Sequence, residues 1–207
     1  DPFEYYSFDE YDHYGGTWQN TLNNSQPYDW LHSNSIYYNS NDSSILVSYR
    51  HISKITKINY PSGIIEWEIG LSDNLIGGSP NNICSELQIN WQHDVKVLNN
   101  NNILLFNNGN LNQSLFNTEE LESSVFEFSI NGNNCELIWN YYLDNIYYGN
   151  GMGSVQKLEN GNYFLSTIAN GGNSFEISID KEIIWNSNYD LFWPEGGLYR
   201  AYNISSL

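Results

Sequence analysis

Three segments of this chain end in the same way, and their repetition limits the folds that the chain can adopt. The segments GIIEWEIG, CELIWNYY and KEIIWNSN contain Trp67, Trp139 and Trp185. Before each one stands an alternating stretch with a polar turn, which predicts an outer β-hairpin. Two further apolar stretches lie upstream of each hairpin, in the pairs SIYY and ILVSYR, VKVL and ILLFNN, and VQKL and YFLSTI. The pattern therefore predicts four strands in each repeat.

A repeat of about 40–50 residues with four short strands and a recurring tryptophan is typical of a β-propeller blade. We therefore expect an all-β fold, a single β-propeller domain of four-stranded antiparallel blades over residues 1–207. About four blades are the lower limit for closure, so a partial or fragmentary ring is the alternative. The predicted blades cover residues 29–70, 91–143 and 153–189. Residues 197–207 are expected to begin a further blade, and residues 1–28 to supply outer strands of an earlier one.

The second repeat carries an insertion, NGNLNQSLFNTEELES, between its second and third strands. Its acidic TEELE piece is expected to form a short helical turn, and its Asn-Gly elements to form loops. Insertions of this kind decorate one face of a propeller.

The charge of the chain excludes several classes of partner. Against 24 Asp and Glu residues stand 7 Lys and Arg, a formal net charge of -17. Such a surface repels phosphate backbones and anionic lipid headgroups, so we expect no nucleic-acid partner. No apolar run approaches the ~20 residues that span a bilayer, so we expect no membrane insertion. The dispersed acidity suits a solvated extracellular surface or weak Ca²⁺ sites.

Cys84 and Cys135 are the two cysteines of the chain, and they are not in CxxC spacing. They are expected either to form one disulfide in an exported protein or to remain as two unpaired buried thiols. The first residues, DPFEYYSFDEYD, lack the basic and apolar regions of a signal peptide, so the chain has the character of a mature or truncated one.

In a propeller the first strand of every blade lines the central channel, so matching positions in these strands should converge. Anchoring on the apolar residue that ends each first strand places His32, His93, Ser154 and Arg200 at one matched position. Two of the four histidines fall there, which indicates a shared functional site. Neighbouring polar residues, among them Asp94, are expected to fix their tautomers. The alternative is that both histidines are structural and tie blades together.

Other charged side chains are candidates of lower specificity. Arg50 and Arg200 are the only arginines, and an anionic ligand would need them; the alternative is an ion pair with one of the many carboxylates. Lys96 and Lys157 alternate with apolar residues and are expected to point to solvent. The histidines without a matched partner are expected to be structural, namely His13 and His51.

The strings DWLHSNSIYY, ILVSYRHISKITKI, SGIIEWEIG, WQHD, ILLFNNG and GLYRAYNISSL stand in an order and spacing that resemble the arylsulfotransferase family of propeller proteins. The resemblance covers about residues 28 to 207. It implies transfer of a sulfuryl group from an aryl sulfate ester to a phenol through a sulfated histidine, without phosphoadenosine phosphosulfate. The small-molecule partners would be an aryl sulfate and a phenol, with no cofactor and no metal. It also implies a secreted, periplasmic or extracellular location.

Set against this chemistry, the candidate residues take two roles. The catalytic candidates are His32, His93 and Arg50, in which one imidazole attacks sulfur and the other acts as acid or base. Arginine and amide donors would hold the sulfuryl oxygens. The candidates for substrate binding are Asn34, Asn108, Gln156, Tyr199 and Arg200.

The chain departs from the family pattern after the WQHD string. It has no histidine beyond His93, and Ser154 stands where a third inward histidine would be expected. The alternative hypothesis is therefore a catalytically degenerate extracellular propeller that binds a small aromatic, glycan or protein ligand. A purely structural surface protein is a third reading of the acidic, Asn-rich composition.

Overall fold

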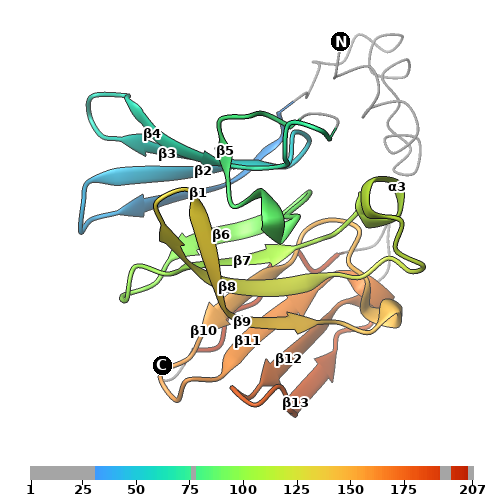
Figure 1. The fold of residues 1–207 in the computed structure, drawn as a ribbon. Coiled ribbons are helices and arrows are strands. Elements are labelled where there is room, and N and C mark those ends of the chain that lie inside the picture. Colours follow the sequence, from blue (N-terminus) through green and yellow to red (C-terminus); the bar gives the residue numbers. More distant parts are fainter. Residues whose placement is uncertain (1–30, 76–77, 192–196, 205–207) are drawn as a thin grey trace, which may run out of the picture.

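The computed structural model describes residues 31–75, 78–191 and 197–204, where three β-sheets follow one another along the chain (Figure 1). The first sheet has the order β1-β2-β3-β4-β5. Its strands are β1 (Ser33–Asn39), β2 (Ser44–Tyr49), β3 (Lys54–Asn59), β4 (Ile65–Ile69) and the short β5 (Asn82–Ile83). The strands β1 to β4 pair antiparallel, and β5 adds to β4 in parallel.

The second and third sheets each contain four antiparallel strands in chain order. The second consists of β6 (His93–Val97), β7 (Ile103–Asn107), β8 (Ser124–Asn131) and β9 (Asn134–Tyr142). The third consists of β10 (Ser154–Lys157), β11 (Tyr163–Thr167), β12 (Asn173–Ile177) and β13 (Ile183–Asn188). The predicted all-β fold of mostly antiparallel sheets is confirmed, and the first sheet carries the parallel β5 as a fifth strand. The described residues form no closed ring.

The helical elements are short and lie in the connections. They are α3 (Asn112–Phe116) and the 3-10 turns η1 (Ser85–Leu87), η2 (Asn145–Tyr147) and η3 (Ala169–Gly171). The helix prediction for the insertion was placed too late, because the helical residues are NQSLF and not TEELE. The NQSLF segment supplies an apolar face, and Leu115 and Phe116 pack against the buried Leu111. The acidic piece has no comparable apolar contact to fix a helix.

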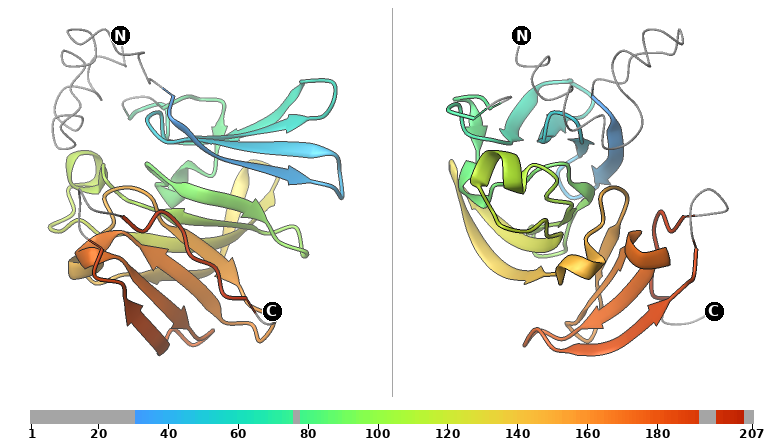
Figure 2. Two further views of the ribbon diagram at one scale, coloured as in Figure 1. Left: turned by 180° about the vertical axis from the view of Figure 1, so that it is seen from behind. Right: turned by 90° about the vertical axis from the view of Figure 1, so that its right-hand side faces the viewer.

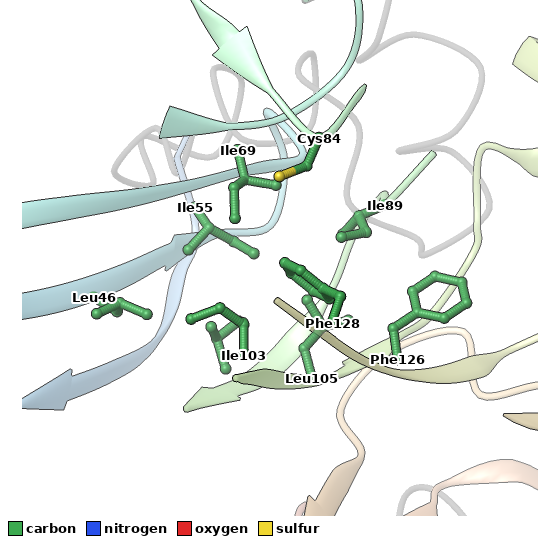
Figure 3. Packing of buried hydrophobic residues seen from close by; sticks show 10 residues of the cluster. Leu46, Ile55, Ile69, Cys84, Ile89, Ile103, Leu105, Phe126 and Phe128 are labelled. Atoms are coloured by element: carbon green, nitrogen blue, oxygen red, sulfur yellow. The ribbon is translucent and has the colours of Figure 1, made fainter. Parts of the chain in front are cut away.

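The second sheet is buried on both of its faces. Along β7, Ile103 and Leu105 face the first sheet. They share one core cluster with Leu46 and Ile55 of the first sheet and with Phe128 of β8 (Figure 3). The alternate residues Leu104 and Phe106 face the third sheet and belong to a second cluster. Because successive side chains of a strand point to opposite faces, a strand buried on both sides reads as a continuous apolar run. This explains the sequence ILLFN.

The first strands of successive sheets lie next to one another and are tied by side chains. Ser35 Oγ on β1 accepts the backbone N–H of Val95 on β6 at 3.2 Å. Asp94 Oδ2 accepts the N–H of Val155 on β10 at 2.8 Å. Each of the two gaps between first strands is therefore bridged by a polar side chain that satisfies a backbone donor of the next sheet.

Residues 197–204, where the sequence predicts a first strand of a further unit, run beside β10 without a strand ladder. The Oγ atom of Ser154 accepts the N–H of Ala201 at 3.1 Å and donates to its carbonyl at 3.0 Å. The side-chain amide of Gln156 pairs with the backbone of Asn203 in the same way. Side chains of β10 thus form hydrogen bonds with backbone N–H and C=O groups that would pair with backbone in a strand ladder. The predicted outer strands at residues 1–28 lie outside the described residues.

Cys84 and Cys135 form a disulfide across 51 residues of sequence. Cys84 follows β5 at the end of the first sheet, and Cys135 lies in β9 of the second. Closing a loop of this length is expected to contribute about 4 kcal/mol to stability by restricting the unfolded chain. Of the two alternatives for these cysteines, the structure has the disulfide.

A buried carboxylate connects the second and third sheets. Glu127 on β8 is fully buried and accepts hydrogen bonds from Lys157 at 2.7 Å, Tyr163 at 2.6 Å and Asn102 at 2.6 Å. Burial alone would raise the pKa of Glu127, but these three donors outweigh it and hold its pKa below the ordinary value. The expectation that Lys157 points to solvent was wrong. Lys96 likewise turns inward, toward Asp94 at 2.9 Å.

The variant Glu127→Gln should lower the free energy of unfolding at pH 7 by about 3 kcal/mol, because it leaves Lys157 without its buried partner. The pKa of Glu127 is lower in the folded state, so its stabilisation is present above the unfolded pKa of about 4.3 and is lost as the pH falls through the folded value. Urea unfolding should therefore show a difference in the free energy of unfolding between the wild type and Glu127→Gln that is smaller at pH 3 than at pH 7.

Glu176→Gln is the matched control for this prediction. Glu176 occupies the same position in the third sheet, opposite Trp185 as Glu127 is opposite Trp139, but it is half-exposed and accepts hydrogen bonds from the side-chain amides of Asn160 and Asn162. Glu176→Gln should lower the free energy of unfolding by less than about 1 kcal/mol. An equal cost for both variants would contradict the role assigned to Glu127.

Candidate functional site

The candidate site lies where β1 and β6 begin and β2 and β7 end, on the side of the molecule that carries α3 (Figures 1 and 2). The β1–β2 pairing continues beyond Ser33, because the carbonyl of His32 accepts the N–H of Arg50 at 3.0 Å. The carbonyl of Leu31 likewise accepts the N–H of His51 at 3.3 Å. These bonds place His32 beside His51, with ring centroids 4.7 Å apart.

Arg50 connects the first sheet with loops that lead into the other two. Its guanidinium lies 3.8 Å from the ring centroid of the buried Trp91, in the loop before β6. It also donates to the carbonyl of Asn150, in the loop before β10, at 2.9 Å. The amide of Asn110 donates to the same carbonyl. Stacking and hydrogen bonding together fix the position of this cation.

His93 is held at both ring nitrogens. Its Nδ1 lies 2.7 Å from the side-chain oxygen of Asn108, and its Nε2 accepts the backbone N–H of Met152 at 3.2 Å. An Nε2 that accepts a hydrogen bond carries no proton in the neutral ring, so Nδ1 carries the proton and donates to Asn108. Asn108 in turn donates to the carbonyls of Gly149 and Met152, at 2.7 and 3.0 Å. This chain of bonds joins β6, the end of β7 and the loop before β10.

Burial, followed by the charge of Arg50, lowers the pKa of His93 to about 3, and His32 contributes in the same direction. The hydrogen bond to Asn108 opposes this shift only in part. Because the folded pKa lies below the ordinary value of about 6.5, the unfolded state takes up the proton first on acidification. The imidazole is therefore neutral at neutral pH and cannot act there as a general acid.

Left-handed backbone conformations gather around the site. The φ angles are 48° at His32, 53° at Trp91, 54° at Asp94 and 59° at Met152. A residue with a side chain in this region costs about 1 kcal/mol or more, and such positions cluster where structure serves function. Gly153 follows at φ 101°, where an added Cβ would lie 2.7 Å from the ring of Phe106. Close packing against Phe106 therefore requires glycine beside the loop that holds His93.

The structure brings four of the predicted site residues into one cluster. His32, Arg50, His93 and Asn108 are connected by the contacts above, and the charges of His32 and Arg50 act on the pKa of His93. Asn108 uses its side chain on His93 and two backbone carbonyls, so in the structure it positions the imidazole.

The other predicted residues lie further along the first strands. Arg200 donates to the carbonyl of Asn34 at 2.9 Å and lies 3.6 Å from Asp94, so it reaches the first two sheets. Gln156 is occupied with the backbone of Asn203, and the carbonyl of Tyr199 accepts the N–H of Gly153. The structure therefore does not bring Gln156 or Tyr199 to the histidine cluster.

Asp94 does not set the tautomer of His93, contrary to the expectation. Its carboxylate accepts Val155 N–H, Lys96 and the hydroxyl of Tyr202, and it faces the gap between β6 and β10. A bulge between His93 and Lys96 turns it away from the imidazole.

The strand register also differs from the sequence alignment of the repeats. His93 pairs with Phe106 and Ser154 with Ser166, and the corresponding pair in the first sheet is Ser35 with Ser48. His32 therefore precedes β1 and does not match His93 by register. Bulges in β1 and β6 insert residues that have no partner on the neighbouring strand. An alignment of the repeats by sequence alone does not detect them.

Sequence reasoning missed three contributors to the site. These are the ring of His51, the indole of Trp91 and the backbone of Met152. A signal existed for His51, because an antiparallel hairpin that pairs the segments LHS and YRH places the two histidines side by side. No sequence signal marks the backbone N–H of Met152.

No three His, Cys, Asp or Glu side chains within residues 31–75, 78–191 and 197–204 are grouped so that they could hold a metal ion. Within the same ranges, no helix has the length and apolar character needed to cross a membrane.

The family model for arylsulfotransferase (ASST) matches residues 5–190 of the chain, so the chain belongs to the arylsulfotransferase family. The match spans both histidines, Arg50 and the loops that hold them. It confirms the family resemblance found in the sequence. No curated protein matches the sequence.

Several solved structures are similar in part. A protein of unknown function from Bacteroides caccae shares 15% identity over 76% of this chain and 46% of its own, with a TM-score of 0.46. A catalytically inactive virginiamycin B lyase from Staphylococcus aureus shares 14% identity over 83% and 45%, with a TM-score of 0.47. BamB from Moraxella catarrhalis shares 13% over 79% and 40%, with a TM-score of 0.43. The chain spans less than half the length of each.

Asn108→Ala should lower the free energy of unfolding by about 2–3 kcal/mol, because it leaves the Nδ1–H of His93 without its acceptor and removes a donor from the carbonyls of Gly149 and Met152. Asn173→Ala is the control, since Asn173 is buried but its amide donates to the carbonyl of Ala169 in the third sheet. Denaturant unfolding would give the two costs. Hydrogen exchange at Met152 N–H should accelerate only in Asn108→Ala, and unchanged exchange there would contradict the proposed bonding.

Proposed function

We propose that this protein is an arylsulfotransferase that moves a sulfuryl group from an aryl sulfate ester to a phenol through His32, independently of phosphoadenosine phosphosulfate. The observation that carries the proposal is the convergence of His32, His93 and Arg50, from two sheets, in a chain of the arylsulfotransferase family. Aryl sulfate and phenol are the substrate classes that the family name supports.

The three sheets are, in this proposal, successive blades of a β-propeller, and their first strands line its central channel. Three observations support this arrangement: the sheets follow in chain order, each runs from its first strand outward, and neighbouring first strands are bonded to one another. The site then stands at the end of the channel where the first strands begin.

His32 is the better candidate for the nucleophile, because it is more exposed than His93. Its side chain is half-buried, whereas His93 is 2% exposed. In the first step an imidazole nitrogen of His32 bonds to sulfur, and the bond from sulfur to the aryl oxygen breaks, so phenolate leaves. In the second step the oxygen of the acceptor phenol bonds to sulfur, the nitrogen–sulfur bond breaks and the acceptor proton passes to solvent.

Arg50 supplies the charge that this transfer needs. Sulfuryl transfer resembles phosphoryl transfer in that positioning and charge stabilisation dominate. Arg50 is buried, held by Trp91 and the carbonyl of Asn150, and a fixed cation in a water-poor site acts more strongly than one in solvent. His93, neutral and bonded at both nitrogens, supports the loop before β10 instead of exchanging protons.

Two observations favour a second candidate, a binding protein without catalysis. The lone pair of His93 is taken by Met152 N–H, so the second imidazole cannot act as acid or base while this bond exists. The first strand of the third sheet contributes Ser154 in place of a further histidine. In this alternative the cluster holds an aryl or anionic ligand without transferring its sulfuryl group.

We also propose that the protein acts outside the cytosol, in a secreted, periplasmic or extracellular location. The disulfide between Cys84 and Cys135 supports this proposal, because cytosolic thiols are kept reduced. The net charge of -17 gives such a protein a strongly solvated surface.

His32→Asn should lower the rate of sulfuryl transfer from nitrophenyl sulfate to phenol by about a thousandfold, because the amide cannot form the covalent intermediate. Release of nitrophenolate gives the rate, and mass spectrometry of the quenched protein should find sulfate on His32 before acceptor is added. The control is Glu176→Gln, in the third sheet away from the histidine cluster, which should leave the activity unchanged.

Two outcomes would overturn the assignment. Full activity of His32→Asn would exclude His32 as the nucleophile. A folded wild-type protein that binds the aryl sulfate without releasing nitrophenolate would favour the binding protein.

A further inference from the structure

A cavity of about 560 Å³ lies between the first and second sheets, at the end of the molecule opposite to the histidine cluster. It is formed where the β1–β2 and β6–β7 turns meet, and these hairpins extend away from α3 (Figure 1). Leu46 and Ile103 lie on its apolar side, at the edge of the core cluster in Figure 3. His93 begins β6 and Val97 ends it at the cavity, so the whole strand separates the two sites.

The equivalent place between the second and third sheets is filled. There Trp139 stacks on Tyr163 with ring centroids 3.6 Å apart and an interplanar angle of 8°. The indole N–H of Trp139 donates to the carbonyl of Ile179 at 2.9 Å. The hydroxyl of Tyr163 donates to Glu127. Stacking and two hydrogen bonds therefore occupy this interface fully.

The strand register shows which residues take these places at the cavity. Trp67 pairs with Lys57 as Trp139 pairs with Glu127, so Trp67 is the counterpart of Trp139. Ile103 and Tyr163 both begin the second strand of their sheets and are counterparts in the same register.

Replacing the ring of Tyr163 by the smaller Ile103 leaves Trp67 without a stacking partner. Among residues 31–75, 78–191 and 197–204, Trp67 makes no ring contact and its N–H makes no hydrogen bond. In its counterpart Trp139 the ring stacks on Tyr163 and the indole N–H donates a hydrogen bond. The cavity therefore lies where the flat ring of Tyr163 stands in the next interface, and the indole of Trp67 lines it.

The rest of the wall is mixed, with Leu46, Val97, Ile103 and Ile130 as apolar members and with Asp42 and Lys57 carrying opposite charges. Lys57 is bound by Asp42 at 2.7 Å and by Glu66 at 2.9 Å, so its charge is already neutralised and offers no site for an anion. The turns contribute several asparagine amides. Those that line the cavity are Asn39, Asn41, Asn100, Asn101 and Asn102.

Most of these amides have donors to spare. Asn102 donates to Glu127, but the side-chain NH₂ groups of Asn39, Asn41, Asn100 and Asn101 have no hydrogen-bond acceptor within the described part of the chain. A ligand in this cavity therefore contacts the indole of Trp67 and several asparagine amides that can donate or accept hydrogen bonds.

We propose that the cavity binds a neutral sugar, with one pyranose ring stacked on Trp67. A sugar ring presents C–H groups to an aromatic face and hydroxyls around its edge, which matches one indole surrounded by amides and the Asp42 carboxylate. A phenol would satisfy the stacking but has a single polar atom for so many donors. An anionic ligand would meet the carboxylate of Asp42, and the charge of Lys57 is already paired. The volume accommodates one or two sugar units.

Saturation-transfer NMR tests the proposal on the intact protein, with glucose, galactose, N-acetylglucosamine and their β-linked disaccharides at millimolar concentration. Phenol serves as a parallel arm. Ring C–H protons of at least one saccharide should receive saturation from the protein, and titration calorimetry would then give its Kd.

Two variants locate the site. Ile103→Tyr restores the ring found in the next interface, so it should fill the cavity and abolish saccharide binding while the protein stays folded by circular dichroism. Asn100→Ala should weaken binding about fivefold through one lost hydrogen bond. Its control is Asn160→Ala, because Asn160 accepts the N–H of Asn162 as Asn100 accepts that of Asn102, but away from the cavity. Asn160→Ala should bind as the wild type does.

Several results would overturn the proposal. These are no saturation of any saccharide with the folded wild-type protein, binding of phenol alone, or equal binding by wild type and Ile103→Tyr. The proposal is independent of sulfuryl transfer, because His32→Asn leaves the cavity intact and should bind the same saccharide with an unchanged Kd.

Discussion

Backbone groups on the inner edge of each sheet have no ladder partner, and the molecule depends on how they are satisfied. A row of unpaired N–H and C=O groups is costly when it faces a neighbouring sheet away from water. Here Ser35 and Asp94 each accept a backbone N–H from the next first strand. This requirement keeps the first strands close enough for short side chains to bridge them. Sheets that converge at one edge must separate at the other, and larger residues fill the widening gap.

Both sites of the molecule follow from this geometry. Where the first strands begin, convergence brings His32 and Arg50 of the first sheet to His93 of the second, and the loop before β10 closes over His93 through Met152 N–H. Near the hairpin turns, the gap between sheets depends on side-chain size. Tyr163 fills it in one interface, and Ile103 leaves a cavity in the other. The same repeat thus gives a tightly packed contact in one interface and a cavity in the other.

The strands could be predicted from the sequence because each repeat signals them locally, through alternating residues, polar turns and the recurring tryptophan. That histidines of the first two repeats lie near one another was also predictable, because first strands lie side by side, although His32 precedes β1 and Arg50 follows β2. What failed depends on register and on contacts across sheets. Bulges displaced His32 from the position matched to His93, and Lys157 turned inward to a carboxylate that only the assembled sheets bring near. Neither feature has a signature in the local sequence.

His93 is a neutral imidazole, held between Asn108 and Met152, in a cluster with His32 and Arg50. Long-range ¹H–¹⁵N NMR of the histidine rings tests this protonation state most directly, because the nitrogen shifts report which atom carries the proton. We expect Nδ1 of His93 to carry the proton and Nε2 to be unprotonated, and we expect this protonation state to be the same at pH 7 and at pH 5. A proton on Nε2, or a titration with a midpoint near the ordinary value of about 6.5, would contradict it.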